Sequence, residues 1–171
     1  MPLDPLAKRF LAMMAAASPG ARTRPTASER RQSLAKLMQF ARAEASDVMA
    51  TDGTLPGPAG DIPYRLYSPA SDGDAVMPGY IFFHGGGMVA GSIETHDRIA
   101  IALADTTGCR LISIDYRLAP EHKFPAAVDD AIAATEFIAR NATSLGIDAE
   151  RLVVGGDSAG GTLAAVVSQH A

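Results

Sequence analysis

Residues 1–45 carry their apolar side chains at helical spacing. In the leading segment, apolar residues recur at i, i+3, i+4, i+7, i+8 and i+11, namely at Leu3, Leu6, Ala7, Phe10, Leu11 and Met14. This spacing places them on one face of a helix. After a break at Ser18-Pro19-Gly20, Thr26 and Glu29 have the spacing of a capping box and predict the start of a second helix. We expect that helix to bury one apolar face, made of Leu34, Leu37, Met38 and Ala41.

From residue 46 onward the pattern changes to short apolar or alternating runs that are separated by helical segments. Strands are predicted at Ile62–Tyr67, Tyr80–Phe83, Arg110–Ile114 and Leu152–Val154. Helices are predicted near Glu94–Asp105, from Pro125 to about Ala142, and from Ser158 onward. This alternation implies a doubly wound α/β fold, in which helices cover both faces of a mostly parallel sheet. We therefore divide the chain into a helical segment, residues 1–45, and an α/β domain, residues 46–171.

Composition and charge exclude several classes of function. The 171 residues are 47% hydrophobic and 20% charged, with a formal net charge of −4. This balance gives no basic surface for nucleic acid or an anionic membrane, and no run is long enough to span a membrane. Lys8-Arg9 before an apolar stretch resembles a short signal peptide, but the helical spacing favours an amphipathic helix, so we expect a cytoplasmic protein. The single cysteine, Cys109, cannot form an internal disulfide.

A serine flanked by glycines follows the last predicted strand. The segment Gly156-Asp157-Ser158-Ala159-Gly160-Gly161 contains the pattern G-x-S-x-G. This is the nucleophile elbow, a sharp turn from strand to helix that exposes the serine oxygen and tolerates only small neighbours. Ser158 is therefore the candidate nucleophile. The backbone N–H of Ala159 is a candidate donor to the oxyanion that forms when an acyl group is attacked.

A second glycine run, His84-Gly85-Gly86-Gly87, follows the predicted strand Tyr80–Phe83. The N–H groups of Gly86 and Gly87 can face the same oxyanion, because glycine lets the backbone approach a substrate closely. We expect His84, Gly85 and Asp157 to support these motifs without reacting. Both motifs follow strands, so they should meet at the carboxyl edge of the sheet, where α/β proteins bind substrates. Together they predict an ester hydrolase.

An alternative interpretation uses the same glycines. Gly85–Ala90 also fits the G-x-G-x-x-A dinucleotide fingerprint, and Asp115 ends the next strand as a ribose-binding acid would. In that fingerprint, however, the helix begins within the glycine run, and the acid follows after about 20 residues. Here Gly91 and Ser92 interrupt, the helical pattern resumes only near Glu94, and Asp115 lies further away. The dinucleotide-binding module is therefore kept only as the weaker alternative.

The sequence resembles the bacterial hormone-sensitive-lipase-like family of α/β-hydrolase esterases. The resemblance is carried by His84–Gly87, Gly91-Ser92, Thr95-His96-Asp97, Asp115–Glu121, Phe124–Ala127, Asp129-Asp130 and Gly155–Gly161. It implies the α/β-hydrolase fold, hydrolysis of carboxylesters with short to medium acyl chains, no metal or other cofactor, and a cap over the acyl pocket that includes residues 1–45. It also implies that Arg117 and Glu121 fix loops near the site. Met88 stands where the family usually has an aromatic residue.

The chain contains only part of the catalytic triad that this fold uses. The triad order is Ser, then Asp or Glu, then His, and no carboxylate follows Ser158. His170 lies at the far end of the last predicted helix, roughly 18 Å from Ser158, and cannot act as the base. We expect His84, His96 and His122 to order loops or to lie on the surface.

We therefore expect the C-terminal part of the fold to be absent from this chain. A complementing polypeptide would then supply the catalytic Asp and His to act on a small ester substrate. Without it, Leu152–Val154 would form an open apolar edge of the sheet. The alternative is a catalytically inactive hydrolase fragment, and homo-oligomer formation stays open.

Overall fold

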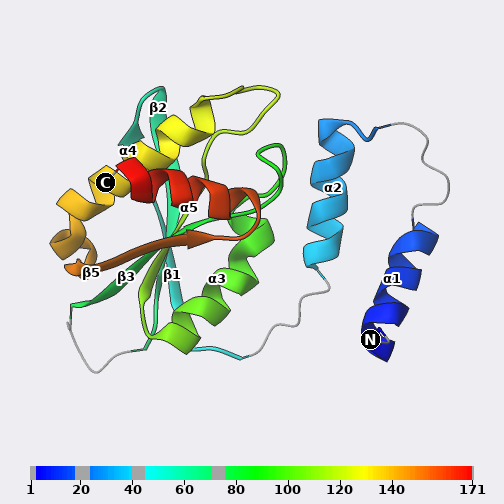
Figure 1. The fold of residues 1–171 in the computed structure, drawn as a ribbon. Helices are drawn as coiled ribbons and strands as arrows, with labels where there is room; N and C mark the ends of the chain where they lie inside the picture. Colours follow the sequence, from blue (N-terminus) through cyan, green and yellow to red (C-terminus); the bar gives the residue numbers. More distant parts are fainter. Residues whose placement is uncertain (1–2, 18–23, 40–44, 71–75, 171) are drawn as a thin grey trace.

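A computed structural model describes residues 3–17, 24–39, 45–70 and 76–170. Its centre is a five-stranded sheet with the strand order β1-β2-β4-β3-β5 (Figure 1). The strands are β1 (Met49–Gly57), β2 (Gly60–Ser68), β3 (Met77–Phe83), β4 (Arg110–Ile114) and β5 (Ile147–Gly156). β3, β4 and β5 run parallel, and the β1–β2 hairpin joins β4 in an antiparallel direction. Both glycine motifs follow strands of the parallel half.

Helices cover both faces of this sheet. They are α3 (Ile93–Thr107), α4 (Ala126–Arg140) and α5 (Ala159–His170), with the short 3-10 helix η1 (Ala142–Leu145) after α4. Successive side chains of β3 point to opposite faces. Ile81 and Phe83 belong to the apolar cluster with α4 and α5, and Phe82 belongs to the cluster with α3. Packing on both faces therefore holds the ends of β3 and β5 in place.

The doubly wound fold expected from the sequence is confirmed, and every expected element of the α/β domain is present. The predicted strand Leu152–Val154 is the middle of the longer β5. Two details differ from expectation. The structure has a strand at Met49–Gly57 that the sequence pattern did not predict. This strand pairs with β2 to form the antiparallel hairpin, which makes the sheet mixed. Helix α4 begins at Ala126, with Pro125 in the cap position, and ends at Arg140.

The two expected N-terminal helices are α1 (Pro5–Ala17) and α2 (Ala27–Met38); α2 lies at one side of the α/β domain, next to α3, and α1 lies beyond it (Figure 1). The capping box of α2 is confirmed. The Glu29 N–H donates to Thr26 Oγ1 at 3.2 Å, and the Thr26 N–H donates to Glu29 Oε2 at 2.7 Å. The division of the chain near residue 45 stays a prediction.

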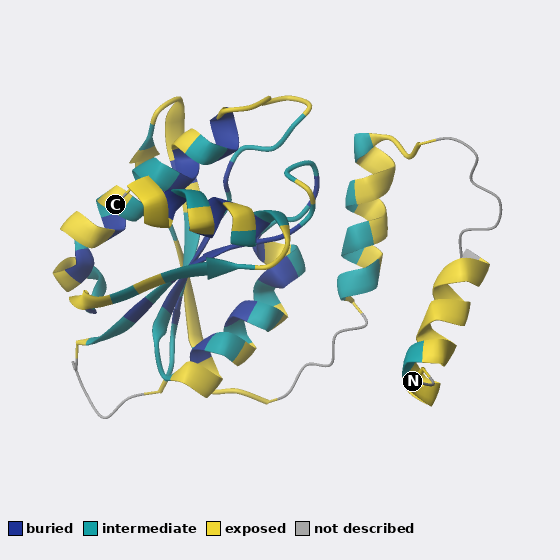
Figure 2. Cartoon of the chain, viewed as in Figure 1, coloured by how far each residue is buried: buried dark blue, intermediate teal, exposed yellow. Residues whose placement is uncertain are grey.

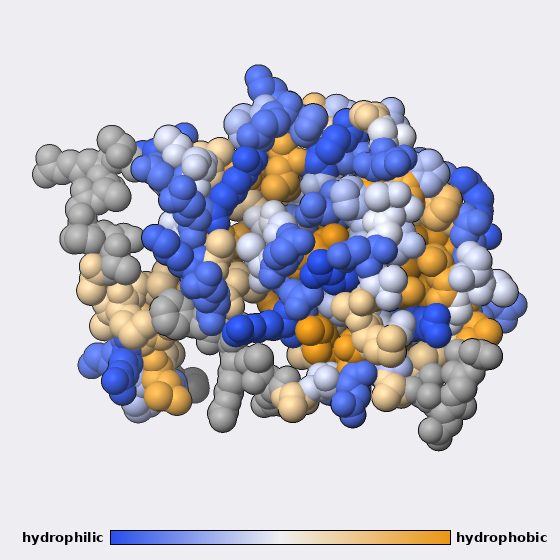
Figure 3. Space-filling view, turned by 180° about the vertical axis from the view of Figure 1, so that it is seen from behind, coloured by the Kyte–Doolittle hydropathy of each residue, from blue (hydrophilic) through white to orange (hydrophobic). Residues whose placement is uncertain are grey.

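The apolar faces of these helices are more exposed than expected. In α2, Leu34, Leu37 and Met38 are only half-buried, so the prediction of a buried face is wrong for this helix, which contacts loops and α3 and does not reach the core. Figure 2 shows most of α1 as exposed, and Leu6 is 76% exposed. Seen from behind, α1 presents apolar side chains on the surface (Figure 3). Ala41 and the break at residues 18–20 lie outside the described residues.

The lengths and compositions of the described helices rule each of them out as a membrane span.

The sheet ends at β5, which has a partner strand on only one side. Within the described residues β5 pairs only with β3, and Val153 is 53% exposed. The open apolar edge predicted for Leu152–Val154 is therefore confirmed. Its free N–H and C=O groups are available to pair with another strand.

Candidate active site

Ser158 lies in the turn between β5 and α5. Its φ is +51°, a left-handed conformation that is uncommon for a residue with a side chain and is characteristic of the strained elbow. Ser158 is exposed, so its hydroxyl is open to solvent. The small neighbours predicted from the motif are required here, because a Cβ on either Gly156 or Gly160 would collide with the carbonyl oxygen of Phe83.

Residues 84–91, which we call the glycine loop, follow β3. The N–H groups of Val89 and Ala90 both donate to the Gly86 carbonyl oxygen, at 3.3 and 3.1 Å. Three successive residues adopt positive φ: Gly86 at +126°, Gly87 at +67° and Met88 at +59°. Gly87 is exposed and Gly86 is half-buried. The loop therefore forms a tight turn whose glycine backbone remains accessible beside the nucleophile elbow.

A carboxylate joins the glycine loop to the elbow. The Gly85 N–H donates to Asp157 Oδ1 at 2.7 Å, across 72 residues of sequence. His96 Nε2 lies 3.5 Å from the same carboxylate oxygen. The structure thus brings together Gly85 and Asp157, two of the residues expected to support the motifs. Within the described residues, no histidine links Asp157 to the Ser158 hydroxyl.

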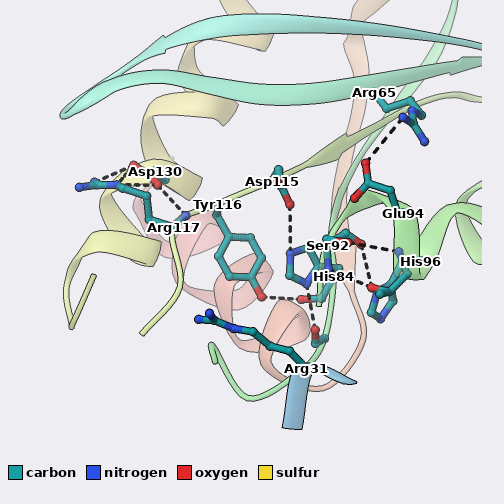
Figure 4. Close-up of polar contacts among 12 residues, drawn as sticks. Arg31, Arg65, His84, Ser92, Glu94, His96, Asp115, Tyr116, Arg117 and Asp130 are labelled. Carbon is teal, nitrogen blue, oxygen red and sulfur yellow. Dashed lines mark hydrogen bonds and ion pairs between the residues drawn. The ribbon is translucent and has the colours of Figure 1, made fainter. Parts of the chain in front are cut away.

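His84 lies beneath the glycine loop in a stack of rings (Figure 4). It is completely buried, and its ring centroid is 4.4 Å from that of Tyr116 and 5.4 Å from that of His96. Burial lowers the pKa of His84 to about 4, so the ring is neutral at pH 7. Its Nδ1 lies 2.9 Å from the Gly85 carbonyl oxygen, a geometry that assigns the proton to Nδ1 as the donor.

Tyr116 is a supporting residue that the motif analysis did not single out. Its hydroxyl donates to the His84 carbonyl oxygen at 2.6 Å. The Nε2 atom of His84 lies 3.9 Å from Asp115 Oδ1, which is too far for a hydrogen bond. Burial raises the pKa of the Asp115 carboxyl. The only sequence signal for Tyr116 was its position, two residues after β4, in the segment that carries the family resemblance.

The loop after β4 is fixed by two ion pairs. Asp130 is 1% exposed and accepts from the Arg117 guanidinium at 2.7 Å and from the Arg117 backbone N–H at 2.9 Å (Figure 4). Glu121 pairs with Arg31 of α2 at 2.6 Å. Both Arg117 and Glu121 therefore hold the loop, as the sequence led us to expect. Next to this loop is a small pocket of about 40 Å³, lined by Met88, Ala119, His122, Phe124, Pro125, Ala127 and Val128.

No general base accompanies Ser158 within the described part of the chain. None of the histidines in that part hydrogen-bonds to the Ser158 hydroxyl. His170 lies at the opposite end of α5 from Ser158, where its Nε2 is 3.7 Å from a carboxylate oxygen of Glu136 in α4. His122 is exposed on the loop after β4. The described residues also contain no group of three or more His, Cys, Asp or Glu side chains that could hold a metal ion.

The geometry also bears on the dinucleotide alternative. Helix α3 begins at Ile93, after the glycine loop, and Ser92 is its N-cap. The N-terminus of α3 therefore does not lie in the glycine run, where the fingerprint requires it for binding a pyrophosphate. This placement disfavours the dinucleotide-binding interpretation.

Comparison with known proteins gives consistent likenesses. Residues 80–171 match the family described as alpha/beta hydrolase fold. Esterase LipI of Mycobacterium tuberculosis is 45% identical over 126 residues, which are 73% of this chain and 39% of that protein. Ethyl acetate hydrolase of Pseudomonas putida is 44% identical over 110 residues, which are 64% of this chain and 35% of that protein.

A solved structure extends the likeness to the whole chain. The ester-hydrolase EH1AB1 from the metagenome of Lake Arreo matches with a TM-score of 0.90 and 44% sequence identity. The match covers 99% of this chain and 55% of that one. The chain therefore spans about half of this relative and a smaller share of the two enzymes above.

Proposed function

Because the chain belongs to the α/β-hydrolase family of hormone-sensitive-lipase-like esterases, we propose that it forms the nucleophile and oxyanion part of a serine carboxylester hydrolase. The observation that best supports this is the hydrogen bond from the Gly85 N–H to Asp157, at 2.7 Å. It joins the glycine loop to the turn that exposes Ser158. The two motifs are thereby held as one site.

In the proposed reaction, Ser158 Oγ attacks the ester carbonyl carbon and its proton passes to a base. The carbonyl oxygen becomes an oxyanion, which accepts hydrogen bonds from the backbone N–H groups of Gly86, Gly87 and Ala159. The N-terminus of α5 adds the positive end of its helix dipole at the same place. Losing one such donor typically costs about 3–4 kcal/mol in the transition state.

The second half of the reaction releases the acyl group. The carbon–oxygen bond to the alcohol breaks as the protonated base returns its proton to the leaving oxygen. Water then attacks the acyl-enzyme as the same base takes its proton, and the base returns that proton to Ser158 Oγ while the bond to the acyl carbon breaks and the carboxylic acid leaves. The base and its orienting acid are a His and an Asp from outside this chain, because the described residues place no histidine on the Ser158 hydroxyl. The complementing polypeptide would carry both and could pair with the open edge of β5.

Short acyl groups are the proposed substrates. The pocket of about 40 Å³ next to Met88 is lined by none of Ser158, Gly86 and Gly87, so the size class is proposed from the relatives. Two relatives support short acyl groups: one is named an ethyl acetate hydrolase, and another, from Salmonella schwarzengrund, is named an acetyl esterase.

The test is covalent labelling by a fluorophosphonate, in which the serine oxygen forms a bond to phosphorus and fluoride leaves. The purified chain is treated alone and together with the C-terminal part of esterase LipI as a separate polypeptide, and intact masses are measured. We expect one adduct on the chain in the mixture, none in Ser158→Ala, and a full adduct in the control Ser168→Ala. Absence of the adduct in both samples would instead support the catalytically inactive fragment.

A further inference from the structure

Arg31, in the middle of α2 (Figure 4), hydrogen-bonds to two different loops. Its Nε–H donates to the Val89 carbonyl oxygen at 2.8 Å, in the glycine loop. One terminal nitrogen donates to the Ala119 carbonyl oxygen at 3.1 Å, in the loop after β4. The same guanidinium binds both carboxylate oxygens of Glu121, at 2.9 and 2.6 Å.

These acceptors lie where the two loops meet. The Ala119 N–H donates to the Met88 carbonyl oxygen at 2.9 Å, which joins the loops directly. Met88 is the last of the three residues with positive φ, and Val89 follows it. Arg31 therefore holds the residue directly after the run of three positive φ values. That run contains Gly86 and Gly87.

The chemistry of the contact needs an arginine. A guanidinium presents five N–H donors in a fixed plane, so it can serve two carbonyl oxygens and a carboxylate together, whereas a lysine is a point charge with no such geometry. The hydrogen bonds from Arg31 lower the pKa of Glu121 to about 2, so the pair remains charged at any pH near neutrality.

Little apolar contact holds α2 against the loops. No described residue of α2 is buried, and its apolar side chains are at most half-buried. Of the four hydrogen bonds of Arg31, one reaches the glycine loop and three reach the loop after β4. The end of α2 also meets α3, where Arg98 Nη1 donates to the Gln39 carbonyl oxygen at 3.3 Å. A shift of α2 would pull on the Val89 carbonyl or release it.

We propose that Arg31 is a positioning residue of this site: it couples the placement of α2 to the shape of the glycine loop, so that the Gly86 and Gly87 N–H groups are aligned while α2 is docked. This inference rests on the proposed function for its effect on catalysis. Its structural part, the coupling between α2 and the loop, does not depend on that function.

The first measurement is hydrogen exchange of the segment 85–91 in the 171-residue chain. The amides of Val89 and Ala90 donate to the Gly86 carbonyl oxygen, so their protection reports the turn itself. We expect Arg31→Ala to speed their exchange up to about tenfold, because the hydrogen bond from Arg31 to the Val89 carbonyl oxygen is lost. Arg31→Lys should recover little, and the neighbouring exposed residue offers a matched control, Arg30→Ala, which should leave the exchange unchanged.

The second measurement separates positioning from simple attachment. In the assembly with the LipI-derived polypeptide, Arg31→Ala should lower kcat for a small ester about tenfold or more with KM changed less than threefold, because misaligned oxyanion donors act on the transition state. Added guanidinium ion should restore part of kcat, and Glu121→Gln should have a smaller effect. Unchanged exchange in Arg31→Ala, or a kcat equal to that of Arg30→Ala, would overturn the proposal. If no assembly hydrolyses esters, the proposed function fails, while the exchange data still decide the coupling.

Discussion

The loops around Ser158 and the helices before residue 45 are held in place by different means. In the loops, backbone groups approach one another so closely that the side chain of an alanine does not fit, as at Gly160 against the Phe83 carbonyl. In α1 and α2, no described residue is buried, and the firmest attachment is the set of hydrogen bonds made by Arg31. The site therefore combines a rigid half with a half whose position depends on a few polar contacts.

This difference teaches where substitutions should matter. In the loops, a substitution lowers the free energy of unfolding because the added atoms have no room. The sheet cannot shift to make room, because both its faces are packed. In the helices the cost arises from lost hydrogen bonds, which are worth about 1 kcal/mol each. Three substitutions test that contrast, and they are ordered by the size of the expected effect.

The largest effect is expected from Gly160→Ala. The added Cβ would meet the Phe83 carbonyl oxygen, and overpacking of this kind costs about 3 kcal/mol of unfolding free energy. Gly161→Ala is the matched control in the same helix, because its Cβ would have the Gly156 oxygen as its nearest neighbour, at 3.2 Å. Urea denaturation of both variants measures the difference. Equal stability of the two would show that the turn relaxes and that the loops are not rigid.

An intermediate effect is expected from Thr26→Ala, which removes the capping box of α2. Loss of an N-cap costs about 1 kcal/mol, which corresponds to about fivefold faster amide exchange in the helix. Thr26→Ser keeps the hydroxyl and should retain the protection. The exchange of residues 27–38 is the measurement. If both variants exchanged at the wild-type rate, interactions other than the cap would stabilise α2.

The smallest effect is expected from Leu6→Ala in α1. Leu6 is 76% exposed, so truncating it should change the unfolding free energy by less than about 0.5 kcal/mol. The same change at Leu163, which is 0% exposed in α5, should cost about 2–5 kcal/mol. Thermal or urea denaturation compares the pair. A large loss in Leu6→Ala would mean that α1 is covered in solution, for instance by a second copy of the chain.

The sequence predicted the parts of the fold that depend on local pattern. Apolar runs followed by glycine placed both motifs after strands, and the pairing of β3 with β5 brings those strand ends together. The capping box at Thr26 was predicted correctly because its residues are neighbours in sequence. The roles assigned to Ser158 and to the oxyanion donors remain predictions, which the labelling experiment addresses.

The contacts that define the site's geometry could not be predicted from local patterns. Gly85 and Asp157 are 72 residues apart, Tyr116 and His84 are 32 apart, and Arg31 and Val89 are 58 apart. These contacts depend on the strand order and on the paths of the loops, and local patterns in a single sequence do not reveal either of them. Helical periodicity likewise predicts that α1 has an apolar face, but it does not predict what covers that face.

The hydrogen bond between Gly85 and Asp157 also constrains the order of folding. It closes a segment of 72 residues, and the entropy lost on closing a loop grows with the logarithm of its length. The β1–β2 hairpin, in contrast, forms between segments that are adjacent in sequence and can appear early. The bond becomes favourable only after β3 and β5 have paired. The serine and the glycine loop thus reach their final geometry together, so a chain in which β3 and β5 have not paired holds neither of them in that geometry.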